Sequence, residues 1–197
     1  FTVTVNEGNE LIELAEKQNK KLSVYQNRSY DSDYKTIKKV LSQKNLGDIV
    51  EAELHFDRFK EELSQKLHKE NLGPGSGSLY DLGSHLIDQA LQLFGMPETI
   101  FGDIASFRPL SQVPDYFEII FFYHDKRVRV KSSYIVREAL PGYVFHGLTG
   151  SFIKPKTNVQ EEMLQAGKIP DTPGWGTEPE SERGLLHAEI NGKEVRE

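Results

Sequence analysis

The sequence predicts an α+β fold, in which a large and mostly antiparallel sheet carries helices on one face. Two observations predict it. The segments 100–107, 115–123 and 127–135 read as successive strands, with a tight turn at residues 124–126 between the last two. Patterns typical of helices occur mainly before this run of strands, so strands and helices do not alternate along the whole chain.

The start of the chain predicts a helix followed by a strand. Thr4 or Asn6 can cap the helix, acidic residues follow in its first turn, and lysines stand at its end. Residues 22–26 alternate as a short strand. A helix and a strand with nothing before them make half of a βαβ unit, and such a unit needs neighbouring strands to pair with.

The following elements complete the sheet and its covering helices. Asp31 begins a second helix, which Gly47 follows, and residues 49–57 alternate as a strand. Residues 59–72 are charged and are predicted to be irregular or partly helical, whereas 79–94 form a clear helix. The later patterns predict strands at 143–149 and 150–153, a helix at 159–166, an extended loop at 167–184 and a terminal strand or arm at 185–190.

Composition limits the classes of protein to which the chain can belong. Its 197 residues allow one domain, or one domain with a fragment of another. A net charge of −6 argues against binding nucleic-acid phosphates, and no apolar run approaches the ~20 residues of a membrane span. The absence of cysteine excludes disulfides and thiol chemistry and fits a cytoplasmic protein. The first residue, Phe1, suggests a fragment or a processed product.

Asp81 and His85 form the sharpest candidate site. They are four positions apart in the sequence, so a helix presents both on one face, one turn apart, with Asp88 near the same side. An imidazole beside a carboxylate is suited to proton transfer near neutral pH. The same residues fit two other interpretations, a structural pair near the first turn of the helix and, with Asp88, a metal site. The metal interpretation lacks a second histidine in a recognised spacing, and we predict no metal.

Two further groups of residues are candidates for ligand binding. Gln26, Asn27 and Arg28 follow a strand of the kind whose carboxyl end binds ligands in open α/β sheets, although a polar domain junction explains them equally well. Arg58 and Lys154 are candidates to bind an anionic or hydroxyl-bearing ligand.

Several stretches of the chain together resemble one family of oxidoreductases. The family is the glucose–fructose oxidoreductase/inositol dehydrogenase (Gfo/Idh/MocA) family, and the chain is most similar to its NADP-dependent scyllo-inositol dehydrogenase-type members. The resemblance covers essentially the whole chain. The stretches are residues 1–4 (FTVT), 22–28 (LSVYQNR), 31–33 (DSD), 75–88 (GSGSLYDLGSHLID), 150–154 (GSFIK) and 160–162 (QEE).

The resemblance implies an enzyme of two domains, with NADP or NAD bound mainly by an N-terminal Rossmann domain. Residues 1–27 would then be the last helix and strand of that domain, and 28–197 the domain for substrate binding and oligomerisation. The catalytic lysine of the family lies in a Glu-Lys-Pro motif, which would end immediately before Phe1, so we expect this chain to be inactive alone.

The resemblance also implies roles for single residues. His85 would be the general acid or base at a substrate hydroxyl, and Asp81 would orient it or bind another hydroxyl. Gln26 and Asn27 would lie at the cofactor, while Asn27, Arg28, Arg58 and Lys154 would bind a polyol or sugar.

A homo-oligomer would form through the open face of the sheet, for which the apolar run 117–123 predicts burial on both sides. Two alternatives remain open. One is a sugar-sensing regulatory protein without catalysis, which would not need a base such as His85. The other is a metal-dependent lyase or isomerase.

Overall fold

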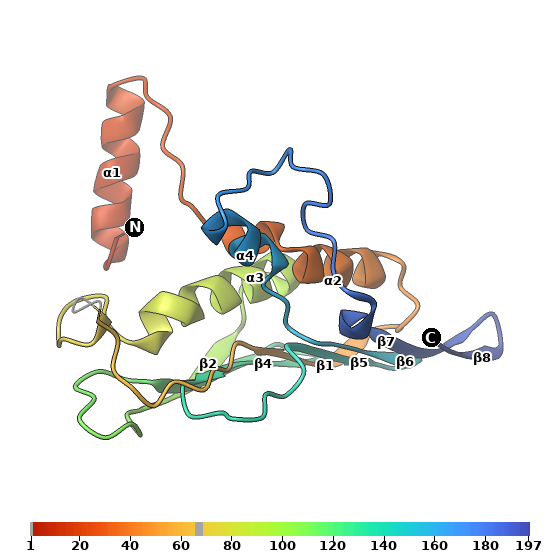
Figure 1. Cartoon of the computed structure of the whole chain (residues 1–197). Helices are drawn as coiled ribbons and strands as arrows, with labels where there is room; N and C mark the ends of the chain where they lie inside the picture. The colour runs from red at the N-terminus through yellow and green to blue at the C-terminus, as the bar shows by residue number, and fades with distance from the viewer. Residues whose placement is uncertain (1, 66–68) are drawn as a thin grey trace.

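An eight-stranded sheet forms the centre of the structure, a computed structural model that describes residues 2–65 and 69–197 (Figure 1). The strand order is β2-β3-β4-β1-β5-β6-β7-β8, and neighbours are antiparallel except for the parallel pair β1 and β4. The strands are β1 (Ile49–His55), β2 (Thr99–Ala105), β3 (Tyr116–Phe122), β4 (Arg127–Ser133), β5 (Tyr143–Gly147), β6 (Gly150–Lys154), β7 (Leu185–Ile190) and β8 (Lys193–Arg196).

The helices α2 (Ser32–Ser42), α3 (Ser84–Phe94) and α4 (Val159–Gln165) all lie on one side of this sheet (Figure 1). Apolar residues at alternate strand positions face the helices and form the core, because a strand points successive side chains to opposite faces. The predicted α+β class is therefore confirmed. Fully buried core residues include Tyr34, Ile37, Leu54, Leu86, Phe117, Val130, Tyr143 and Phe145.

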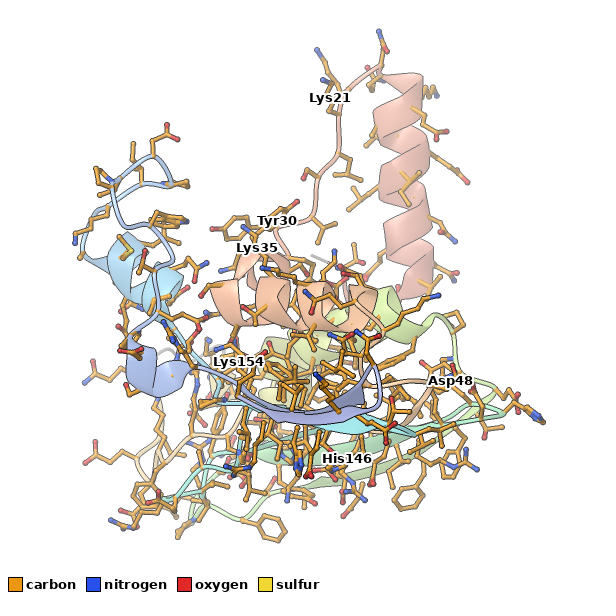
Figure 2. The ribbon with its side chains drawn as sticks, turned by 90° about the vertical axis from the view of Figure 1, so that its right-hand side faces the viewer. Lys21, Tyr30, Lys35, Asp48, His146 and Lys154 are labelled. Atoms are coloured by element: carbon orange, nitrogen blue, oxygen red, sulfur yellow. The ribbon has the colours of Figure 1, made fainter. Side chains whose placement is uncertain are left out.

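The opposite face of the sheet has no helix over it within the described ranges (Figure 1). In β3, Phe117 and Phe121 are buried, whereas the alternate residues Ile120 and Phe122 are half-buried. Burial of β3 was predicted on both faces, but within this chain only the face toward the helices is buried. His146 in Figure 2 lies on this open side of the sheet, and Lys154 lies on the helix side.

Helix α1 (Val5–Lys17) stands away from the sheet (Figure 1). Its predicted cap is confirmed, since the Thr4 side chain accepts from the Glu7 backbone N–H and the Glu7 carboxylate accepts from the Thr4 N–H. None of its residues is buried. The predicted strand at 22–26 is wrong: within the described ranges these residues are irregular, because no strand lies beside them to pair with.

The C-terminal end contains a strand that the sequence analysis did not predict. Strand β8 pairs with β7 through a hairpin whose two turn residues, Asn191 and Gly192, both have positive φ. None of the helices within 2–65 and 69–197 has the length and apolar character needed to cross a bilayer.

Candidate active site

A polar cleft of about 590 Å³ brings together most of the predicted site residues. Four parts of the chain line it, and each contributes polar side chains. They are the segment 25–28, the loop after β1 with Arg58 and Lys69, the start of the site helix with Asp81 and His85, and the region of α4 with Asn158, Glu161, Glu162 and Gln165.

The site helix begins with a π-helical turn, η3 (Leu79–Gly83), which leads directly into α3. Gly77 precedes it with φ of +88°, and a Cβ at this position would lie 3.0 Å from the Pro114 carbonyl oxygen, so a glycine is required there. Asp81 lies within the π turn and His85 in the first turn of α3. Turns of this kind are frequent at functional sites, where they change the direction in which side chains project.

Gln26 is the hydrogen-bond partner of His85. The His85 Nδ1 lies 2.7 Å from Gln26 Oε1, and a carbonyl oxygen can only accept, so Nδ1 carries the proton in the neutral ring. The Nε2 lone pair of that tautomer is then available as a base. Burial and the nearby Arg28 lower the pKa of His85, outweighing the opposite effects of Asp81 and Asp88. The imidazole is therefore neutral at neutral pH.

Asp81 has partners other than His85 in the described part of the chain. Both of its carboxylate oxygens accept from Lys69 Nζ at 2.7 Å, and Tyr134 donates its hydroxyl to Oδ2 at 3.3 Å. Burial alone would raise the pKa of Asp81, but Lys69, Arg58 and Tyr134 outweigh that effect and lower it. Asp81 is thus an anion that acts on His85 through its charge and not through a hydrogen bond.

Arg28 lies at the wall of the cleft and is almost fully buried. Its Nη1 contacts Asp31 and Asn158 at 3.3 Å each, and its Nη2 lies 3.5 Å from Glu161. The backbone carbonyl of Arg28 accepts from Gln89 Nε2 at 2.9 Å, which ties this segment to α3. The position of Arg28 beside His85 is therefore held by the fold on both sides.

The other predicted ligand contacts divide into two groups. Asn27 and Arg58 line the cleft, and the Arg58 guanidinium lies 4.9 Å from the centre of the Phe56 ring. Lys154 does not line it. Its side chain is buried on the helix side of the sheet (Figure 2), where Nζ contacts Glu178 Oε2 at 2.5 Å and the Glu182 carbonyl at 2.7 Å. Because the Lys154 ammonium is buried and paired with the Glu178 carboxylate, it is not available to a ligand in the cleft, and we no longer count Lys154 among the candidate ligand contacts.

Asp88 and the metal alternative can be judged from the same geometry. Asp88 accepts from Ser29 Oγ at 2.6 Å and from Gln92 Nε2 at 2.8 Å, contacts that hold η1 (Asn27–Tyr30) to α3. Within residues 2–65 and 69–197, no group of three or more histidines or carboxylates is placed to hold a metal ion.

A second cavity, of about 740 Å³, adjoins the cleft and shares Asp81 and His85 with it. Its wall also includes Val24, Tyr25 and Gln26, while the lining residues include no lysine or arginine. A lining with a carboxylate and no cationic side chain suits the nicotinamide end of a dinucleotide, whose ring is cationic in the oxidised form, and not the pyrophosphate, which binds cationic groups or a helix N-terminus. The residues present therefore fit the reactive end of NAD(P).

Together, the fold and the cleft define an α+β domain with a neutral histidine and a carboxylate in the wall of a polar cleft. Comparison with known proteins then gives the family. The model of the GFO/IDH/MocA C-terminal domain matches residues 34–153, and the chain belongs to this family of oxidoreductases. The resemblance predicted from the sequence is confirmed.

Individual relatives agree with this assignment. The chain is 39% identical over 176 residues to the uncharacterized oxidoreductase YdgJ of Escherichia coli, covering 89% of this chain and 51% of the relative. It is 38% identical over 178 residues to the NADP⁺-dependent scyllo-inositol 2-dehydrogenase IolW of Bacillus subtilis, covering 90% and 49%. A crystal structure of an oxidoreductase from Bacillus cereus matches with a TM-score of 0.87 at 32% identity, covering 98% of this chain and 65% of that one. The chain thus spans about half the length of the curated relatives it matches.

Lys69 and Tyr134 both bind Asp81, and neither was predicted from the sequence; Lys69 also lines the cleft. Lys69 lies within the charged segment 59–72, predicted as irregular or partly helical, where one of three lysines gives no signal by itself. Tyr134 follows β4 and reaches Asp81 only because the sheet brings it there. Gln26 was predicted as a cofactor contact, and the structure adds its contact with His85.

Proposed function

We propose that the protein is an NAD(P)-dependent oxidoreductase that acts on a CH–OH group of a polyol or sugar of the inositol type. This chain would supply the domain for substrate binding and oligomerisation. The observation that carries the proposal is a neutral His85, with its Nδ1 proton held by Gln26, in a cleft lined by charged and amide side chains. Such side chains are the usual partners of hydroxyl groups. The relative that acts on scyllo-inositol supports the same substrate class.

His85 is the acid and base of the proposed reaction. When bound, the nicotinamide supplies the acceptor or donor of hydride. In the oxidation, His85 Nε2 takes the proton of the reacting hydroxyl, and in the reduction it returns it. The lowered pKa of His85 keeps Nε2 free for this step, and the Asp81 carboxylate stabilises the imidazolium that forms. Asn27, Arg28 and Arg58 bind the remaining hydroxyls.

The division of the chain follows the same proposal. We assign residues 1–27 to the end of a nucleotide-binding domain and 28–197 to the substrate domain. Two observations support this division: α1 buries none of its residues, and the curated relatives are about twice as long as the matched region. Gln26 and Asn27 would lie at the nicotinamide of NADP or NAD, and the 197 residues alone would not turn over substrate.

The open face of the sheet is the surface we assign to a homo-oligomer in the cytoplasm. Phe101 and Ile120 are opposite each other on β2 and β3, and Phe122 lies beside them on the same face. Phe101 is exposed, and Ile120 and Phe122 are half-buried, so the three form an apolar patch of the kind that marks an association surface. Light scattering on the chain and on an Ile120→Asp variant tests the assignment, which predicts a smaller particle for the variant.

An activity assay tests the proposed reaction. The reading frame would be extended upstream of the first residue, and the product assayed for change in reduced-nicotinamide absorbance against a panel of inositols and aldoses, with the 197-residue chain as the control. We expect turnover by the longer protein only. Cofactor binding by the longer protein without turnover of any member of the panel would contradict the proposal and favour a sensor.

A pair of histidine variants in the longer protein tests the role of His85. His85→Ala is expected to lower kcat by roughly 10²–10⁴ while cofactor affinity stays unchanged, because only the proton transfer is lost. His124→Ala, in the exposed turn between β3 and β4, is the matched control and is expected to keep full activity. An unchanged kcat in His85→Ala would show that another group transfers the proton.

A further inference from the structure

The loop between β1 and the site helix places a cation directly on Asp81. Lys69 Nζ lies 2.7 Å from both carboxylate oxygens, so the ammonium bridges them symmetrically. The two side chains are about one-third exposed, at 35% for Lys69 and 31% for Asp81. An exposed pair with no further support is usually mobile and weak. The position of Lys69 therefore depends on what holds its backbone.

A buried ion cluster next to Lys69 supplies that support. The carboxylate of Glu70 binds Arg108 Nη2 at 2.8 Å, and Arg108 Nε binds Asp115 Oδ2 at 3.1 Å. Asp115 is fully buried, and its oxygens also accept from the backbone N–H groups of Phe107 and Arg108. Within the same loop, Glu70 accepts from the Ser64 N–H at 2.7 Å. The cluster thus fixes the backbone of Glu70, and with it the neighbouring Lys69, to the loop before β3.

Arg108 also contacts Tyr134, the second hydrogen-bond partner of Asp81. The Arg108 guanidinium lies 5.1 Å from the centre of the Tyr134 ring, and the Tyr134 hydroxyl donates to Asp81 Oδ2 at 3.3 Å. Both partners of Asp81 therefore lie against one cluster, although they come from different parts of the chain. Buried ion clusters are seldom more stabilising than an apolar core of the same volume. A role in placing Lys69 and Tyr134 accounts for this one better than stability does.

We propose that Lys69 is a positioning residue for Asp81, and that the Glu70–Arg108–Asp115 cluster holds Lys69 where its ammonium meets that carboxylate. The inference concerns the same site as the proposed function and, for its catalytic consequence, rests on it. Lys69 keeps Asp81 anionic and fixed in direction, so that the charge of Asp81 acts on His85 throughout the proton transfer. The other charged or titratable groups facing Asp81 are the Arg58 guanidinium, the Tyr134 hydroxyl and the His85 imidazole.

A titration of the Asp81 carboxyl by carbon NMR in the 197-residue chain tests the proposal without any activity. We compare the wild type with Lys69→Met and Lys69→Arg, and use Lys168→Met in the exposed loop after α4 as the control. The pKa of Asp81 should rise in Lys69→Met, because burial then acts with less opposing charge, and should stay low in Lys69→Arg and in the control. An unchanged pKa of Asp81 in a folded Lys69→Met chain would overturn the proposal.

A second variant tests the cluster. Arg108→Lys keeps the charge but loses the paired contacts with Glu70 and Asp115, and it should raise the pKa of Asp81 in the same direction as Lys69→Met. An Arg108→Lys chain that is folded and has the wild-type pKa of Asp81 would overturn the role of the cluster. The Lys69 variants test the positioning role independently of Arg108, since Lys69 is partly exposed and its replacement leaves the core intact.

Kinetics of the longer protein then separate this proposal from the proposed function. Lys69→Met should lower kcat by about 10- to 100-fold, as expected for a misplaced catalytic group, with recovery in Lys69→Arg. If no polyol or sugar is turned over but the pKa of Asp81 responds to Lys69, the proposed function fails and the positioning role stands. If polyol turnover is found and Lys69→Met retains both full kcat and the wild-type pKa of Asp81, the positioning role fails alone.

Discussion

Gln89 joins three parts of the molecule at the back of the cleft, and replacing it gives a stability change that can be worked out from the contacts. Its Nε2 donates to the Arg28 carbonyl at 2.9 Å, and its Oε1 accepts from the Tyr143 hydroxyl at 3.1 Å. Both Gln89 and Tyr143 are almost completely buried. In Gln89→Leu both hydrogen bonds are lost, while the side chain keeps a similar volume.

The cost follows from what each former partner is left with. The Arg28 carbonyl retains a longer bond from the Asp31 N–H at 3.3 Å, so its loss costs about 1 kcal/mol. The Tyr143 hydroxyl is left buried without its acceptor, which costs about 1–3 kcal/mol. Gln89→Leu should therefore lower the free energy of unfolding by about 2–4 kcal/mol.

A double-mutant cycle with Tyr143→Phe checks this reasoning by urea denaturation. In the Tyr143→Phe background, Gln89→Leu leaves no hydroxyl unsatisfied, so its cost should fall to about 1 kcal/mol. The cost of the double change should accordingly be smaller than the sum of the single changes by about 1–3 kcal/mol. A loss under about 1 kcal/mol in Gln89→Leu, or strictly additive losses, would refute the argument.

Two further predictions concern the sheet. A Cβ on Gly147 would lie 2.1 Å from the Leu46 carbonyl oxygen, so Gly147→Ala should lower the free energy of unfolding by about 3 kcal/mol and Tm by roughly 6–12 °C in calorimetry. Gly102→Ala on β2, where nothing lies within 4 Å of the added Cβ, is the control. Equal losses of Tm in the two variants would contradict the prediction. Burial lowers the pKa of His55, but the carboxylates of Asp57, 3.6 Å from Nδ1, and Glu53, hydrogen-bonded to Nε2 at 2.8 Å, outweigh it and raise that pKa above 6.5. The stabilisation that protonated His55 contributes should be complete below about pH 6.5 and lost as the pH rises through the raised pKa. In urea unfolding, the difference in free energy of unfolding between wild type and His55→Gln should therefore shrink toward alkaline pH. A difference that does not change with pH would disprove the prediction.

Local patterns explain why most of the fold was predictable. The alternation of β1 and the apolar run of β3 fix which side chains face the helices, and both patterns are visible over a few residues. The segment 22–26 has the same local pattern but is irregular, because pairing depends on a strand elsewhere. In contrast, β8 was predictable, since Asn191-Gly192 is the residue pair that a two-residue hairpin turn with positive φ favours.

For the candidate site, the sequence predicted which residues lie in the cleft but not which residues they contact. The spacing of Asp81 and His85 placed both in the wall of one cleft, as a helix dictates, but it also suggested that they pair with each other. The spacing argument assumes a regular α-helix, whereas Asp81 lies in a π turn, which the residues 79–83 do not distinguish from an ordinary helix start. The actual partners, Lys69 and Gln26, come from segments 12 and 59 residues away in the sequence. A helix pattern can thus identify the titratable groups of such a site, whereas their protonation depends on partners that only the tertiary fold supplies.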